Sequence, residues 1–119
     1  MAKNVYVVCE PTRIENNVRV KSVDVSPAAK WGKLVIVLQS SQSIIAPVPM
    51  VRTLNEALAT FDEFDYLVPV GDPILMCAAA SVAARNNNGR VKFLKWDRRN
   101  KDYMVVQIDL NTGVQDGNK

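Results

Sequence analysis

The chain has 119 residues, of which 48% are hydrophobic and 23% charged, and its net charge at pH 7 is +3. These values are typical of one globular domain with a single core. No apolar run approaches the ~20 residues that span a bilayer, and the first residues lack the pattern of a secretion signal. We therefore expect a soluble intracellular protein that makes no membrane contact.

The sequence contains no histidine, which removes the most common general base and metal ligand of enzymes. Its two cysteines, Cys9 and Cys77, lie in separate apolar segments, and we expect both to be reduced and buried. Two isolated cysteines do not form a zinc site. The composition therefore predicts no metal site and no cofactor, and it favours binding over catalysis.

The first third of the chain predicts strands separated by turns. Residues 5–9 are rich in β-branched and aromatic side chains and predict a buried strand. A second strand is expected at 18–25 after the turn signal Asn16-Asn17, and a single helical turn at 26–32. Residues 34–38 form a continuous apolar run, the pattern of a strand that is covered on both faces.

The middle of the chain alternates helix and strand. Leu54, Leu58 and Phe61 recur at helical spacing, which predicts an amphipathic helix at about 50–62. A strand at 66–70 then leads through Gly71 into an apolar helix at 73–86. Asp72 is suited to cap this helix and Pro73 to begin it.

The last third predicts an antiparallel hairpin. Residues 90–96 and 103–110 have strand patterns, and the polar segment between them is short enough for a hairpin loop. Residues 111–119 are polar, contain two glycines, and are expected to form a flexible tail. The folded part is therefore expected to be a single domain over residues 1–110.

The predicted fold class is α/β. Two strand–helix–strand crossovers between residues 34 and 96 should give three parallel strands. The outer strand pairs would add antiparallel strands at the edges, so that the sheet is mixed. If both helices cover one face, the second face needs a cover that a dimer partner could supply.

Several polar residues follow the predicted strands and would meet in a crevice at the carboxyl ends of the parallel strands, where open α/β sheets bind ligands. Three carboxylates there could bind a divalent cation through oxygen ligands, which makes a nucleotide- or metal-binding enzyme one alternative. The simpler interpretation of Gly71-Asp72 is a capped turn, because the glycine-rich phosphate loop is absent. The candidate crevice residues are Glu10, Arg13, Ser40, Gly71, Asp72 and Asp97.

The segment 85–102 is strongly basic, with seven Lys or Arg residues against two Asp, a net charge of +5. Trp96 lies among these cations, and such combinations bind single-stranded nucleic acid. A solvated hairpin tip is the simpler alternative. A homodimer is a third, because residues 56–65 carry the opposite charge. The candidate residues for nucleic acid or another partner are Arg90, Lys92, Lys95, Trp96, Arg98, Arg99 and Lys101.

Three stretches, Val5–Arg13, Tyr66–Pro73 and Gly89–Arg98, together resemble a family of small uncharacterised proteins encoded by tailed bacteriophages, including phages of marine bacteria. The resemblance implies expression in the cytoplasm of an infected bacterium, or packing in a virion, and a binding role. We therefore predict a non-enzymatic protein that binds a host or phage protein, or nucleic acid, through the basic hairpin at 90–103. The alternatives are the crevice enzyme and a virion structural component.

Overall fold

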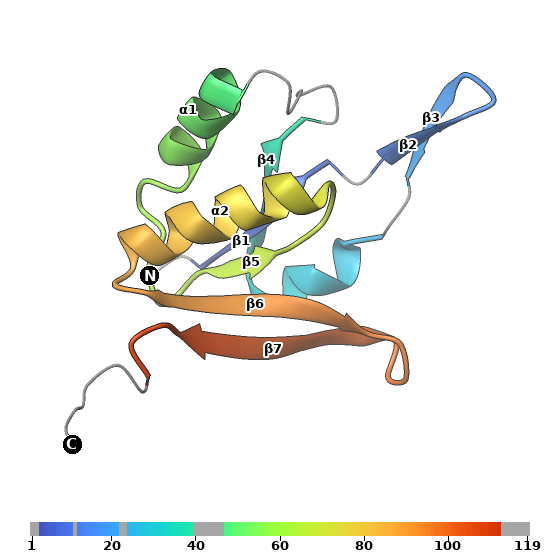
Figure 1. Cartoon of the computed structure of the whole chain (residues 1–119). Helices are drawn as coiled ribbons and strands as arrows, with labels where there is room; N and C mark the ends of the chain where they lie inside the picture. Colours follow the sequence, from blue (N-terminus) through green and yellow to red (C-terminus); the bar gives the residue numbers. More distant parts are fainter. Residues whose placement is uncertain (1–2, 11, 22–23, 40–46, 113–119) are drawn as a thin grey trace.

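A computed structural model describes residues 3–10, 12–21, 24–39 and 47–112; for residues 12–15 and 19–21 it describes the backbone alone. Its elements are shown in Figure 1. In chain order they are β1 (Asn4–Cys9), β2 (Thr12–Glu15), β3 (Val18–Lys21), the 3₁₀ helix η1 (Ser26–Trp31), β4 (Lys33–Leu38), α1 (Pro47–Ala57), β5 (Tyr66–Val68), α2 (Pro73–Asn86), β6 (Arg90–Asp97) and β7 (Asp102–Asp109).

A five-stranded sheet with the order β4-β1-β5-β6-β7 is the centre of the molecule. The first four strands are mutually parallel, and β7 pairs with β6 in antiparallel orientation. The α/β class, the mixed sheet, the two main helices and the C-terminal hairpin are therefore confirmed. The expected flexible tail falls largely on 113–119, outside the described residues.

The prediction of an antiparallel edge position for the N-terminal strand is wrong. β1 lies inside the sheet, parallel to both β4 and β5. Its last five residues are all buried, so the strand needs a neighbour on each side and cover on each face. The long connection through β2, β3 and η1 returns the chain to the same end of the sheet, as parallel pairing requires. Among the described strands, β2 and β3 pair with each other alone, in a separate two-stranded sheet.

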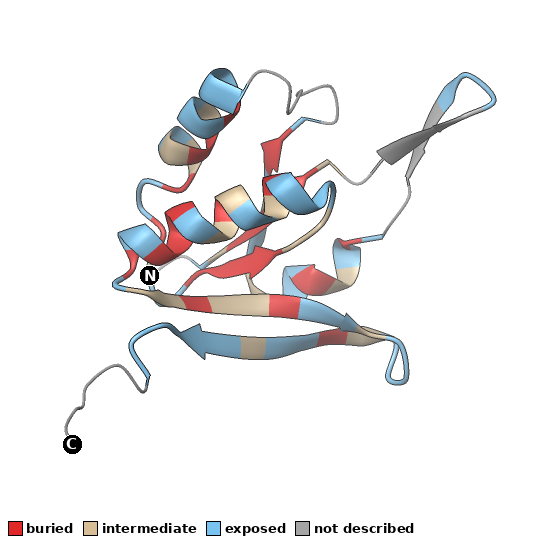
Figure 2. Cartoon of the chain, viewed as in Figure 1, coloured by how far each residue is buried: buried red, intermediate tan, exposed pale blue. Residues whose placement is uncertain are grey.

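The inner strands β1 and β5 are covered on both faces by the chain itself, whereas much of β7 is exposed (Figure 2). The prediction that residues 34–38 are covered on both faces is wrong, because β4 is an edge strand and Ile36 is exposed. On one face, Leu54 and Leu58 from the α1 segment and Ala79 from α2 pack on sheet residues that include Tyr6 and Leu67. On the other face, η1 packs over a second buried cluster through Ala28. The cover that we expected from a dimer partner therefore comes in part from η1.

Helix α2 begins and ends as its sequence predicts. The Asp72 carboxylate accepts a hydrogen bond from the Ile74 N–H at 2.8 Å, and Pro73 is the first helical residue. Gly89 has φ +82°, and its N–H donates to the Ala84 carbonyl at 2.7 Å. Gly89 therefore adopts the left-handed conformation that is common after a helix C-terminus, and its N–H group satisfies a carbonyl of the last helical turn. No helix in the described ranges is long and apolar enough to cross a membrane.

Helix α1 spans 47–57, not 50–62, because the apolar periodicity continues past the helical backbone. Phe61 lies beyond the helix yet is buried, and its ring contacts Tyr6 at a centroid distance of 5.8 Å. Within the helix, the Thr53 hydroxyl donates to the Pro49 carbonyl one turn earlier, at 3.1 Å. The apolar pattern extends beyond the helix because Phe61 packs in the core although it lies after the last residue of α1.

Asp65 is the buried carboxylate that joins the link after α1 to the start of β1. Its oxygens accept hydrogen bonds from the N–H groups of Asn4 and Asp62, each at 3.0 Å. Burial raises the pKa of this carboxyl above its usual value, against the two backbone hydrogen bonds that favour the charged form. The acidic link is therefore partly a structural feature.

Candidate functional site

A cleft opens where β6 continues beyond its parallel neighbour β5. Pro69 follows β5 and has no N–H to donate, so pairing stops after Val68. β6 continues to Asp97, and Leu67 opposite Phe93 is the register pair that joins the two strands. The resulting space has a volume of about 690 Å³ and lies at the carboxyl ends of the parallel strands. Open α/β sheets bind ligands at this position.

The cleft has apolar walls and a charged rim that carries two cations and the Asp24 carboxylate. Val68 and Leu94 contribute buried side chains to its lining, and Gly71 approaches from the turn before α2. Lys95, Trp96 and Arg98 line the same cleft from the hairpin. The structure thus brings Gly71, from the predicted crevice, together with three residues of the predicted basic surface.

Trp96 is positioned for contact with a ligand. It packs against Tyr103 in an edge-to-face arrangement with ring centroids 5.1 Å apart, which fixes the indole. Even so, 41% of its surface remains exposed. An indole held at one edge and open to solvent can stack on a planar group.

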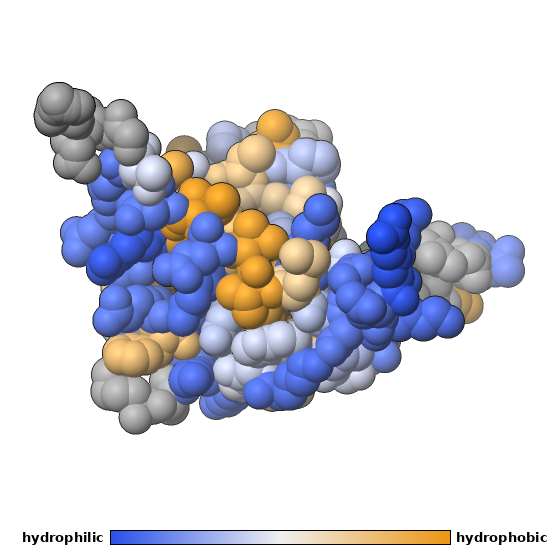
Figure 3. Space-filling view, turned by 90° about the horizontal axis from the view of Figure 1, so that it is seen from below, coloured by the Kyte–Doolittle hydropathy of each residue, from blue (hydrophilic) through white to orange (hydrophobic). Residues whose placement is uncertain are grey.

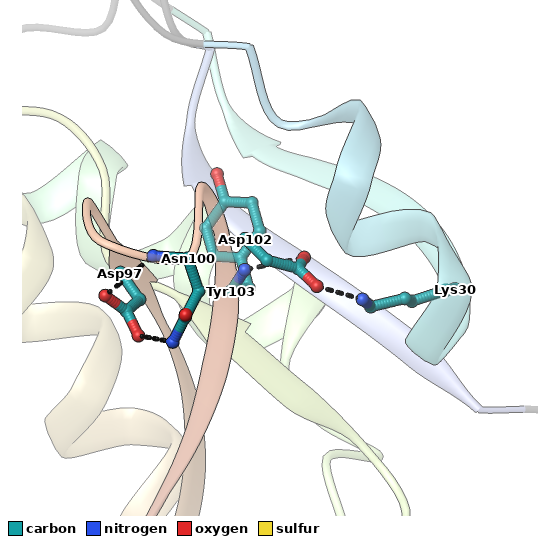
Figure 4. A network of polar contacts seen from close by, with 5 residues as sticks. All are labelled: Lys30, Asp97, Asn100, Asp102 and Tyr103. Carbon is teal, nitrogen blue, oxygen red and sulfur yellow. Dashed lines mark hydrogen bonds and ion pairs between the residues drawn. The ribbon is translucent and has the colours of Figure 1, made fainter.

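The hairpin turn beside the cleft is held by its own polar contacts (Figure 4). The Asp97 carboxylate accepts from the Arg99 N–H at 3.0 Å and from the Asn100 side-chain amide at 2.7 Å. Asp102 forms an ion pair with Lys30 of η1. The hydrogen bond from Lys30 holds the pKa of Asp102 below its usual value, with a contribution from the Tyr103 N–H. Both carboxylates of the hairpin end are therefore engaged in stabilising it.

Four cations at this end of the hairpin have no such partners among the described residues. In the part of the chain that the structure describes, Lys95, Arg98, Arg99 and Lys101 form no ion pair. All four are exposed and belong to the last residues of β6 and the turn. Their charge is available to an external anion.

The predicted basic surface is divided by the fold, because its other two cations lie at the start of β6. Arg90 forms an ion pair with Glu63 at 3.6 Å, and the Lys92 ammonium lies 4.6 Å from the centre of the Tyr66 ring. A cavity of about 280 Å³ adjoins these groups. Since its cations already have partners, this cavity is the weaker candidate.

The predicted crevice is only partly assembled. Asp72 caps α2 and Asp97 holds the hairpin turn, so neither carboxylate lines the cleft. Glu10 is also absent from the lining. The side chain of Arg13 and the whole of Ser40 lie outside what the structure describes. Within the described ranges, no group of three or more Cys, Asp or Glu side chains is arranged to hold a metal ion.

Tyr103 adds a feature that the sequence did not reveal. It lines the cleft, its hydroxyl is buried, and that hydroxyl has no hydrogen-bond partner within the described structure. Burial, with a further effect from the charge of Asp24, raises the pKa of Tyr103. An unpaired buried hydroxyl costs about 1–3 kcal/mol, so a ligand or water that reached it would relieve that cost. Pro69 within a strand pattern is the sequence signal for the cleft itself.

The two cysteines are both free, as predicted. Cys9 is buried, which raises its pKa. Cys77 is exposed on α2, so the prediction that it is buried is wrong. The alanine-rich pattern of α2 does not distinguish its inner face from its outer face.

Comparison with known proteins identifies a family but no individual related protein. No curated protein and no solved structure matches the chain. A family model matches residues 3–110, which include all five strands of the main sheet and the whole hairpin end. The chain therefore belongs to the phage protein family described as Phage Pam3 gp32-like protein.

Proposed function

We propose that this phage protein is a non-enzymatic binding protein that holds single-stranded nucleic acid at the end of the β6–β7 hairpin. One base stacks on Trp96 at the cleft, while the cations around it contact phosphates on either side. The observation that carries the proposal is the exposed Trp96 among four cations without ion pairs in the described structure. Those cations are Lys95, Arg98, Arg99 and Lys101.

Single-stranded nucleic acid matches this surface better than a small anion does. The four cations extend along the strand end and around the turn, so one small ligand could not contact all of them. Aromatic side chains beside Lys and Arg bind single strands because stacking is available to every base while the cations contact the backbone. The mild net charge of +3 conceals a strongly basic hairpin end.

The polar contacts of the cleft support a binding role over a metal-dependent reaction. The predicted crevice carboxylates Asp72 and Asp97 accept hydrogen bonds from the N–H groups of Ile74 and Arg99 and do not line the cleft. The apolar walls of the cleft and its cations Lys95 and Arg98 line it instead, together with the Asp24 carboxylate. In an infected bacterium, such a surface would act in the host cytoplasm on phage or host nucleic acid.

Affinity for labelled single-stranded oligonucleotides, measured over a range of salt concentrations, tests the proposal. Each phosphate contact to a single strand contributes a slope of about −0.7 in log affinity against log salt, so four contacts predict a slope of about −3. The double substitution Arg98→Glu/Arg99→Glu should weaken binding and reduce the slope to about −1.5. Lys33→Glu/Arg52→Glu changes the net charge equally at exposed positions elsewhere and should retain the wild-type slope.

Two results would contradict the proposal. One is binding that does not depend on salt, or no binding at all. The other is an equal loss of affinity in both double variants, which would show a response to net charge alone. A host or phage protein captured by the same hairpin in nuclease-treated extracts, with no affinity for oligonucleotides, would replace nucleic acid as the partner.

A further inference from the structure

The outer edge of β7 is open and apolar. β7 is the last strand in the sheet order, with β6 on one side and no described strand on the other. On the side of β7 that faces α2, called the helix-facing side below, Met104 is 45% exposed and Ile108 is 39% exposed, with Val106 between them. Figure 3, which views the molecule from the β7 side, shows a hydrophobic area in the centre of this face with hydrophilic surface around it.

This edge lacks the features that normally prevent strands from pairing between molecules. Edge strands are commonly protected by charged residues, proline, bulges or short length. β7 pairs with β6 over eight consecutive residues without a bulge. Between Asp102 and Asp109 it has no charged residue and no proline.

The direction of the backbone groups follows from one hydrogen bond. The Leu110 N–H donates to the Gly89 carbonyl at 2.8 Å, which continues the pairing of β7 with β6. Along an antiparallel strand, the N–H and C=O groups of successive residues point to opposite sides. The even-numbered residues of β7 therefore direct their N–H and C=O groups toward β6. Val105 and Gln107 direct their N–H and C=O groups toward the open edge. The N–H of Tyr103 at the same edge is already bonded to Asp102, at 2.8 Å.

We propose that β7 pairs in antiparallel orientation with β7 of a second copy of this chain, with Val106 opposite Val106 of the partner subunit. Val105 then exchanges hydrogen bonds with Gln107 of the partner subunit. On the helix-facing side, Met104 lies opposite the partner's Ile108. The two sheets become one continuous sheet, and the exposed apolar side chains of each copy contact those of the other.

We assign a second copy of the chain as the partner of this edge because the edge of β7 is complementary to itself in this register. Asp102 lies opposite Leu110 of the partner subunit and Asp109 opposite the partner's Tyr103, so no like charges face each other. Lys101 lies diagonally across from Asp109 of the partner subunit, a distance that long side chains span. In the proposed register the two-fold axis of the dimer passes between the two copies of Val106. If it passed between the two copies of Val105 instead, the charged Asp102 of the partner subunit would lie opposite the apolar Ile108.

This dimer leaves free the cleft, Trp96 and three of the four cations of the proposed nucleic-acid site, and it contacts that site through Lys101 alone. The cleft lies between β5 and β6, whereas the dimer uses the opposite edge of β7. The two proposals therefore stand or fall separately.

Cysteine crosslinking tests the register. The exposed Cys77 is first replaced by serine, so that it forms no crosslink of its own. In the proposed register, Val106→Cys places two cysteines opposite each other with Cα atoms about 4.5 Å apart, within the range of a disulfide. Mild oxidation should yield a covalent dimer. Val105→Cys is the control, because its two copies lie diagonally at about 7–8 Å and should crosslink much less.

Sedimentation equilibrium tests the dimer without a crosslink. The wild-type chain should show twice its monomer mass in the micromolar range, and Ile108→Lys should sediment as a monomer while its circular dichroism stays that of the folded chain. Val18→Lys replaces a side chain that is 58% exposed in the separate β2–β3 sheet and should remain dimeric. A monomeric wild type, or a dimer that Val105→Cys crosslinks as efficiently as Val106→Cys, would overturn the proposal.

Discussion

Replacing Trp96 by alanine removes the surface on which a base would stack. The indole is fixed at one edge by Tyr103 and is 41% exposed, so part of its ring surface is open to a base. Stacking of one base contributes about 1–3 kcal/mol. Since about 1.4 kcal/mol corresponds to a factor of ten, the dissociation constant should rise roughly 5- to 150-fold.

Fluorescence anisotropy with a labelled single-stranded oligonucleotide measures this change. Trp96→Phe keeps an aromatic ring against Tyr103 and should lose less affinity than Trp96→Ala. The lost aromatic contact should destabilise the fold by about 1 kcal/mol, so a thermal melt of each variant must accompany the binding curve. A folded Trp96→Ala protein that binds as tightly as wild type would refute the stacking argument.

Three further substitutions test the structural roles of individual residues. Asp72→Ala should lower the unfolding free energy by about 1 kcal/mol and the melting temperature by about 4 °C, because α2 loses its cap, while oligonucleotide affinity stays unchanged. Gly71→Ala should lower the urea midpoint, because Gly71 has φ +113° and an added Cβ would lie 2.9 Å from that of Cys9; an unchanged midpoint would show that the turn can rearrange. Asp65→Asn concerns pH. Because folding raises the pKa of Asp65, its contribution to stability is greatest below the pKa of the unfolded chain and is lost as pH rises through the folded pKa. The unfolding free energy of Asp65→Asn relative to wild type should therefore increase above about pH 4, and a constant difference would contradict this assignment.

Local signals in the sequence were sufficient to predict α2 and the C-terminal hairpin. Asp72 and Pro73 specify a helix start through interactions within a few residues, and the structure places both in those roles. The strands of the hairpin are adjacent in the chain, so their pairing needs no long-range information. The apolar runs at 34–38 and 66–70 likewise predicted parallel strands, although the first of these lies at the edge of the sheet.

The position of β1 could not be predicted in this way. Its neighbours, β4 and β5, are distant in the sequence, and the choice between an edge and the interior depends on long-range packing. The completely apolar run at Val5–Cys9 was the available signal, because a strand buried on both faces belongs inside a sheet.

The candidate site was predicted in pieces. Gly71 and the cations of the hairpin were each identified, but as parts of two different surfaces. Their convergence follows from the early end of β5 at Val68 and the continuation of β6 to Asp97. This difference in strand length is a property of the assembled sheet. The buried hydroxyl of Tyr103, which has no hydrogen-bond partner among the described residues, likewise becomes evident only in three dimensions.

Residue-resolved NMR titration is the most direct test of the central claim that the hairpin end is a nucleic-acid interface. A single-stranded oligonucleotide added to the ¹⁵N-labelled wild-type chain should shift the amide signals of residues 94–103 and of Gly71, together with the indole N–H signal of Trp96. The signals of α1 and β4 should stay in place. Shifts that concentrate on α1 and β4, or a spectrum that does not change, would contradict the account.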